Sequence, residues 1–169
     1  MIKRLTSKKI KPKKYVSEKI TLNVSKLEND FYRADLIIHG LDHSRASYEG
    51  RVFINNPDAD NETPDDPSQG YAGSFFVFGH GGCLGSSGHC DVYRPTIRFN
   101  MIPNVLIPER VSLIITDTLR RLAKYTNEFS FTIVPRLAGG SENVCQKDAD
   151  LENVVSLSRL SIETYDEDE

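Results

Sequence analysis

Apolar and polar residues alternate along several short stretches of this chain, as in strands that bury one face. Ile20, Leu22 and Val24, for example, are separated by polar residues. The same reasoning predicts strands over residues 20–25, 31–39, 48–55, 72–78, 97–101, 111–116, 128–135 and 155–162. Such a series of short strands predicts an all-β fold, an antiparallel β-sandwich of about seven to eight strands.

One segment has helical spacing instead. Leu119, Leu122 and Ala123 fall on one face of a helix, which Thr116 or Asp117 can cap. We therefore expect one short helix of about two turns, covering one end of the sheets. The phenylalanines of the strand over 72–78 are expected mainly in the core, although Phe78 is placed to face a partner.

The two ends of the chain carry opposite charge. Residues 1–17 are rich in lysine and predict a basic flexible arm or linker, whereas residues 164–169 form an acidic tail. The β-sandwich domain is expected between them, over residues 18–163. A net charge of -3 argues against nucleic acid as a partner through bulk electrostatics.

The chain has no apolar run of about 18 residues and no apolar segment after its basic start. We therefore expect no membrane partner, no secretory signal and a cytoplasmic location. A structural disulfide is disfavoured in the cytosol, which makes metal binding or reactive thiols the more favourable interpretation of the cysteines.

A glycine-rich loop after the strand over 72–78 holds two of the four histidines and two of the three cysteines. These residues are His80, Cys83, His89 and Cys90. A second histidine pair, His39 and His43, lies at the end of the strand over 31–39. Because copper and zinc favour imidazole and thiolate, all six residues are candidate metal ligands, with copper or zinc as the metal.

Several interpretations of this loop stay open. Adjacent residues such as His89 and Cys90 rarely both bind one ion tetrahedrally, so three ligands here and one from elsewhere fit better. A structural zinc site is one alternative, and a Cys–His enzyme is another. The loop can also be a surface hairpin in which Cys83 and Cys90 are free or disulfide-bonded. Cys145 is expected to be a lone thiol in a polar loop.

Acidic residues gather between the strands over 48–55 and 72–78. They are Asp58, Asp60, Glu62, Asp65 and Asp66. Their spacing differs from that of a helix-loop-helix calcium site, so a solvated acidic loop is expected.

Five stretches, in order, resemble the C-terminal β-sandwich domain of polyphenol oxidases and related tyrosinases. They are RVFINNPDAD at 51–60, YAGSFFV at 71–77, VSLIITDTL at 111–119, FTIVPR at 131–136 and LSRLSIE at 157–163. The basic linker before the first strand is similar as well. The likeness covers roughly residues 12–165, and the order of its motifs makes it more specific than any one of them.

The resemblance implies an accessory role. In that family the domain packs over a helical domain whose six histidines hold two copper ions, where it shields the copper entrance, keeps the enzyme latent and assists folding or copper loading. This chain has four histidines and no long helix, so by itself it is not expected to be an enzyme. The expected partner is a tyrosinase-like dicopper catalytic domain or subunit.

Two features depart from the family pattern. The family's Lys-Phe-Asp-Val signature reads Glu49-Gly50-Arg51-Val52 here. Plant members also have a shorter basic segment in place of the His/Cys loop over 80–90. Because Cu(I) favours thiolate and imidazole, this added loop fits a role in binding or delivering copper.

Overall fold

The computed structural model describes residues 11–23, 31–81, 106–137 and 151–166. Within these residues lie nine strands, one 3₁₀ turn and one short α-helix. In chain order they are β1 (Tyr15–Val16), β2 (Ile20–Thr21), β3 (Arg33–Leu41), β4 (Tyr48–Ile54), η1 (Pro67–Gln69), β5 (Tyr71–Val77), β6 (Glu109–Ile114), α2 (Thr116–Ala123), β7 (Glu128–Phe129), β8 (Phe131–Leu137) and β9 (Arg159–Tyr165). The predicted all-β class is confirmed.

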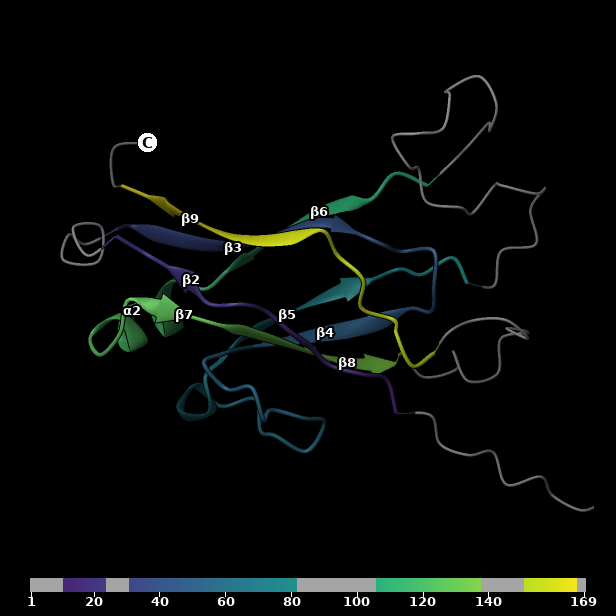
Figure 1. Ribbon diagram of the computed structural model, residues 1–169, viewed down its shortest axis with the longest axis horizontal. Helices are drawn as coiled ribbons and strands as arrows, with labels where there is room; N and C mark the ends of the chain where they lie inside the picture. Colours follow the sequence, from purple (N-terminus) through teal and green to yellow (C-terminus); the bar gives the residue numbers. More distant parts are fainter. Residues whose placement is uncertain (1–10, 24–30, 82–105, 138–150, 167–169) are drawn as a thin grey trace, which may run out of the picture.

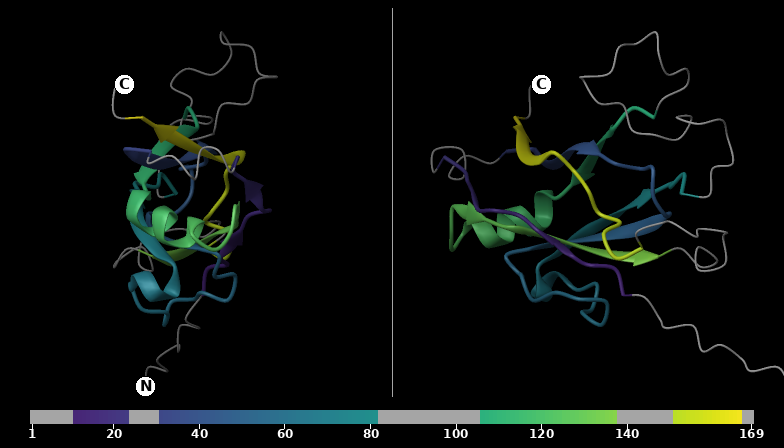
Figure 2. Two further views of the ribbon diagram at one scale, coloured as in Figure 1. Left: turned by 90° about the vertical axis from the view of Figure 1, so that its left-hand side faces the viewer. Right: turned by 45° about the vertical axis from the view of Figure 1, so that its right-hand side comes forward.

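Two antiparallel sheets face each other across the core (Figure 1). One has the strand order β1-β8-β4-β5, and the other has the order β6-β3-β9. Strands β2 and β7 form a separate short pair beside α2. Turning the molecule keeps the two layers apart (Figure 2), so the predicted sandwich is confirmed.

Alternation along the strands explains the core between the sheets. Leu36 and Ile38 of β3 and Val52 and Ile54 of β4 are fully buried in one cluster. Burial of each such side chain stabilises the fold by about 1.5–3 kcal/mol. Position 50 also faces this core, where a Cβ atom would overlap the ring of Phe75 on β5. Glycine at this position therefore leaves room for a large cross-strand side chain.

The acidic loop between β4 and β5 folds back over the outer face of the four-stranded sheet (Figure 1). Its anchor is Arg51, whose side chain is 1% exposed. The guanidinium donates to Asp65 Oδ1 at 2.7 Å and also to the carbonyl oxygens of Asp60 and Thr63. The loop carboxylates stay exposed, as predicted for a solvated loop, but its backbone is held against the sheet.

Several boundaries differ from those predicted. Tyr15–Val16, expected in the basic arm, form a strand that pairs with β8. The last strand begins at Arg159 instead of residue 155, and the strand expected over 97–101 lies outside the described residues. The first predicted strand is confined to Ile20–Thr21 within the described part of the chain.

Helix α2 closes one end of the sandwich, as expected, but the prediction of its cap is wrong. Ile115 occupies the cap position and makes no side-chain capping bond. The hydroxyl of Thr116 accepts a hydrogen bond from the backbone N–H of Ala34 at 3.0 Å, which ties the helix start to β3. No helix in the described part of the chain is long and apolar enough to cross a membrane.

Candidate functional site

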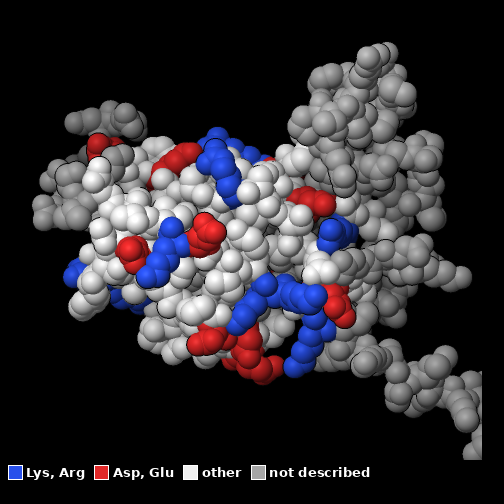
Figure 3. Space-filling model, in the orientation of Figure 1, with Lys and Arg blue, Asp and Glu red and all other residues white. Residues whose placement is uncertain are grey.

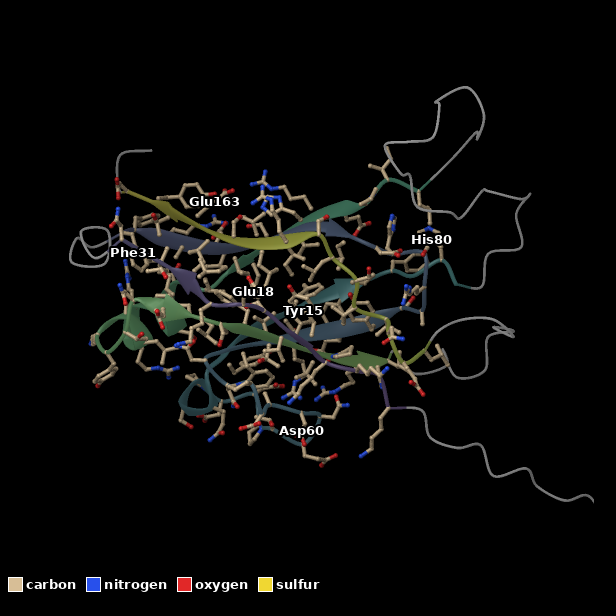
Figure 4. All side chains as sticks on the ribbon, in the orientation of Figure 1. Tyr15, Glu18, Phe31, Asp60, His80 and Glu163 are labelled. Carbon is tan, nitrogen blue, oxygen red and sulfur yellow. The ribbon has the colours of Figure 1, made fainter. Side chains whose placement is uncertain are left out.

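His80 lies beside His43 at the end of the sandwich opposite α2 (Figure 4). After β5 the chain continues along the segment that precedes β4. The backbone N–H of His80 donates to His43 O at 2.9 Å, and that of Gly81 donates to Arg45 O at 2.8 Å. Gly79 permits this close approach, because a Cβ atom there would overlap the carbonyl oxygen of Arg45. Two predicted ligands that are distant in the sequence thus come together.

Hydrogen bonds determine which ring nitrogens of this histidine pair carry protons. Nε2 of His43 lies 3.0 Å from Ile107 O, and Nδ1 of His80 lies 3.3 Å from His43 O. Because a carbonyl oxygen can only accept, both nitrogens must be protonated. In the neutral rings, Nδ1 of His43 and Nε2 of His80 then carry free lone pairs. Histidines that bind metals are commonly oriented in this way, with the second nitrogen donating to a carbonyl.

The free nitrogen of His43 faces a carboxylate. Its Nδ1 lies 3.3 Å from Glu109 Oε1, the residue is 8% exposed, and the contact falls outside hydrogen-bond geometry. A lone pair and a carboxylate oxygen are both electron donors, so a metal ion between them would be a favourable partner for both. This end of the sandwich therefore favours a cation.

A second buried polar atom lies near the same carboxylate. The hydroxyl of Tyr48 is buried and has no hydrogen-bond partner among the described residues. Burial raises the pKa of this hydroxyl far above its ordinary value, and the negative charges of Asp42 and Glu109 raise it further. Tyr48 is thus neutral and keeps its proton as a donor at this end of the sandwich.

His39 lies elsewhere. It occupies the outer face of β3, where its Nε2 is 2.8 Å from the hydroxyl oxygen of Ser161 on β9. Burial, together with the positive charges of Arg159 and Arg110, lowers the pKa of His39, although Glu163 opposes this effect. The sequence placed His39 and His43 at one strand end, but the structure gives them different partners.

The described residues do not complete a metal site by themselves. Within them, no three His, Cys, Asp or Glu side chains are placed to hold one ion. The predicted ligands Cys83, His89 and Cys90, and the lone Cys145, lie outside the described residues. A metal at His43 and His80 requires further donors from that part of the chain or from a partner.

Sequence reasoning missed Glu109 and Tyr48 as members of this site. Tyr48 lies in the strand predicted over 48–55, and Glu109 lies just before the strand predicted over 111–116 and begins β6 in the structure. Only tertiary pairing reveals their place at this site. Glu109 reaches the histidines because β6 pairs with β3, with Glu109 opposite Leu41. No local pattern could have signalled either residue.

Two exposed apolar residues lie next to the histidine pair. Phe78 is 80% exposed and Ile107 is 72% exposed, and the Phe78 ring meets the His80 ring edge-on with centroids 5.7 Å apart. Phe75 is buried as predicted, but Phe76 is exposed, because consecutive strand residues point to opposite faces. We call Phe78, His80 and Ile107 the histidine rim.

Comparison with known proteins gives a likeness of fold. No family model and no curated protein match the chain. The structure of latent aurone synthase (polyphenol oxidase) from natural source matches with 15% identity and a TM-score of 0.50, over 95% of this chain and 28% of that chain. The recombinantly expressed latent enzyme matches with 16% identity and a TM-score of 0.46, over 92% and 24%.

This chain therefore spans about a quarter of the length of the aurone synthase chains that it matches. At this level of identity the match with a TM-score of 0.50 is informative about the fold. The β-sandwich of this chain resembles one part of a polyphenol oxidase, in agreement with the resemblance predicted from the sequence motifs.

Proposed function

We propose that this chain is a non-catalytic accessory module that shields the copper entrance of a tyrosinase-like dicopper catalytic domain. The main support for this proposal is that almost the whole chain corresponds to only about a quarter of a latent polyphenol oxidase. A module of this kind regulates access to an active site that lies in a different domain or subunit.

The histidine rim is the surface that we assign to the catalytic partner. Exposed apolar side chains that lie together mark interaction surfaces. Phe78 and Ile107 are both largely exposed, Phe78 against the His80 ring and Ile107 where its carbonyl oxygen meets His43. His80 lies at the end of the sandwich that α2 does not cover. Burying each of them against a partner would favour association by about 1.5–3 kcal/mol.

The proposed binding surface can be tested by affinity measurements. The chain is mixed with the dicopper oxidase domain encoded in the same or a neighbouring reading frame, and binding is followed by calorimetry. We expect Phe78→Asp to weaken binding at least about tenfold, since it places a charge in an apolar contact. The matched control is Tyr125→Asp, which alters a residue that is 85% exposed near α2 and should leave the affinity unchanged. Equal effects of the two variants would contradict the assignment.

We further propose that His43 and His80 contribute to a copper site on this module, completed by Cys83, His89 and Cys90 or by the partner. In support of this proposal, each ring has one nitrogen within hydrogen-bond distance of a carbonyl oxygen, which leaves the other nitrogen of the neutral ring as a lone-pair donor. Thiolate and imidazole are the ligands that Cu(I) prefers. Bound there, copper would be held for loading into the enzyme, and Glu109 would balance its charge.

Titration of the reduced chain with Cu(I) in the presence of a competing chelator tests this site. We expect binding that is lost in the double variant Cys83→Ser/Cys90→Ser and weakened at least about tenfold in His80→Ala. Cu(I) affinity that is unchanged by these substitutions, or no Cu(I) binding at all, would contradict the copper proposal. Either result would leave the shielding proposal intact.

Zinc is the second candidate metal, because it accepts the same side chains in structural sites. Melting curves with and without a chelator separate the two roles. A large loss of stability on chelation indicates structural zinc, whereas a small loss with rapid exchange indicates copper handling. A Cys–His enzyme would instead show thiol alkylation far faster than that of an ordinary cysteine.

A further inference from the structure

The outer face of the three-stranded sheet carries three basic side chains close together. Pairing of β3 with β9 puts His39 directly opposite Arg159. Arg110 on β6, the other neighbour of β3, also lies near enough to act on the His39 ring. Figure 3 shows basic groups over this sheet, at the top of the view. We call His39, Arg110 and Arg159 the basic row.

Most charges on this face are paired, which makes the basic row conspicuous. Asp35 accepts two hydrogen bonds from the Arg33 guanidinium and one from the Ser112 hydroxyl, each at 2.7 Å. Arg110 Nη2 donates to Glu163 Oε1 at 2.9 Å, across β3. Arg159 is exposed, and its side chain makes no hydrogen bond or ion pair with the described residues.

The basic row is therefore electrostatically unsatisfied. Arg110 on β6 and Arg159 on β9 flank the His39 ring of β3 from both sides, and their positive charges lower the pKa of His39. Among the described residues, Glu163 is the one acidic side chain that engages the row, through Arg110, and it also accepts a hydrogen bond from the Tyr165 hydroxyl at 3.1 Å. A local excess of positive charge thus persists on a chain whose net charge is -3.

We propose that the basic row is a binding site for a small phosphate-type oxyanion. Guanidinium groups present several N–H donors in a planar fork, which suits phosphate oxygens. The hydroxyl of Ser161 is hydrogen-bonded to His39. Ser161 lies two positions from Arg159 on β9, so it adds a polar group to the proposed site. Two guanidiniums face one carboxylate, so the row keeps a net positive charge that an oxyanion can balance.

This site is independent of the proposed shielding function. The basic row lies on the outer face of one sheet, whereas the histidine rim lies at an end of the sandwich. Anion binding can therefore fail while shielding holds, and shielding can fail while anion binding holds.

Titration of the full chain with inorganic phosphate, at constant ionic strength and followed by two-dimensional NMR, tests the proposal. We expect saturable shifts at the His39 ring and at the Arg159 side chain. Arg159→Gln should weaken binding about tenfold or more, since it removes a charge-assisted bond. Because Arg159 has no partner among the described residues, the variant should fold normally, and the dispersion of its spectrum checks this.

Two further variants keep the test discriminating. Arg136→Gln removes an arginine from the outer face of the other sheet, where it pairs with Glu49 at 3.3 Å, and should leave phosphate binding unchanged. Arg110→Gln should weaken binding less than Arg159→Gln does, because Arg110 is already engaged by Glu163. Shifts that do not saturate, or equal behaviour of Arg159→Gln and Arg136→Gln, would overturn the proposal.

Discussion

The outer faces of the two sheets use arginine in opposite ways. On the four-stranded sheet, Arg51 is buried beneath the acidic loop and donates to a carboxylate and to loop carbonyl oxygens. On the three-stranded sheet, Arg159 is exposed and has no partner among the described residues. The covered Arg51 thus holds the fold together, whereas the exposed Arg159 leaves its charge available for the anion that we propose.

The largest effect that this comparison predicts is on stability. Arg51→Met should lower the free energy of unfolding by about 3 kcal/mol, because Asp65 and several loop carbonyls lose a buried charged donor. Urea unfolding of the whole chain measures this change. On the same face, Arg136→Met breaks only an exposed pair and should cost less than about 1 kcal/mol. Similar losses in the two variants would show that burial of Arg51 has no special role.

A smaller effect is expected at Asp35, the buried acid of the open face. Hydrogen bonds from Arg33 and Ser112 hold the pKa of Asp35 below its ordinary value, although burial opposes them. The resulting stabilisation is fully present above the unfolded pKa of about 3.9 and is lost as the pH falls through the lower folded value.

Asp35→Asn should therefore destabilise the chain by about 1–3 kcal/mol at neutral pH, since charged hydrogen bonds are replaced by weaker ones. It should also reduce the acid-induced loss of stability below about pH 4. Unfolding midpoints measured from pH 3 to pH 7 check both expectations. Asp58→Asn, in the exposed part of the acidic loop, serves as the control. Identical pH profiles for the wild type and Asp35→Asn would contradict the role of this acid.

The smallest effect concerns the basic row and leaves stability nearly unchanged. Arg159→Gln removes a positive charge that lowers the pKa of His39, so that pKa should rise toward its ordinary value. Burial and Arg110 continue to lower it, which makes the recovery partial. An NMR titration of the His39 ring measures the change. A pKa that stays the same or falls would show that Arg159 does not act on His39.

Strand alternation was sufficient to predict the sandwich, because burial of one face imposes a period of two. Tyr48, Val52 and Ile54 are buried in β4 as this period requires. The same period places position 51 outward, yet Arg51 is among the most buried side chains. The reason is tertiary: the loop over 56–69 returns to cover this face, and no local pattern encodes that return.

The candidate site was predictable as a set of residues but not as an arrangement. His43 and His80 were both predicted ligands, and a continuation of the β4–β5 pairing places them side by side. His39 is only four positions from His43, but it lies on the outer face of β3, where it meets Ser161. His43 follows the end of β3 at Leu41, after a register shift in the strand. The metal-binding roles of Cys83, His89 and Cys90 stay predictions, because these residues lie outside the described part of the chain.

The most direct test of the central claim is the rate of diphenol oxidation by the tyrosinase-like dicopper partner, measured as the chain is added. Shielding predicts that the rate falls and reaches a floor at about one equivalent, and that the chain alone shows no oxidation. A rate that stays unchanged while binding is complete would contradict the account.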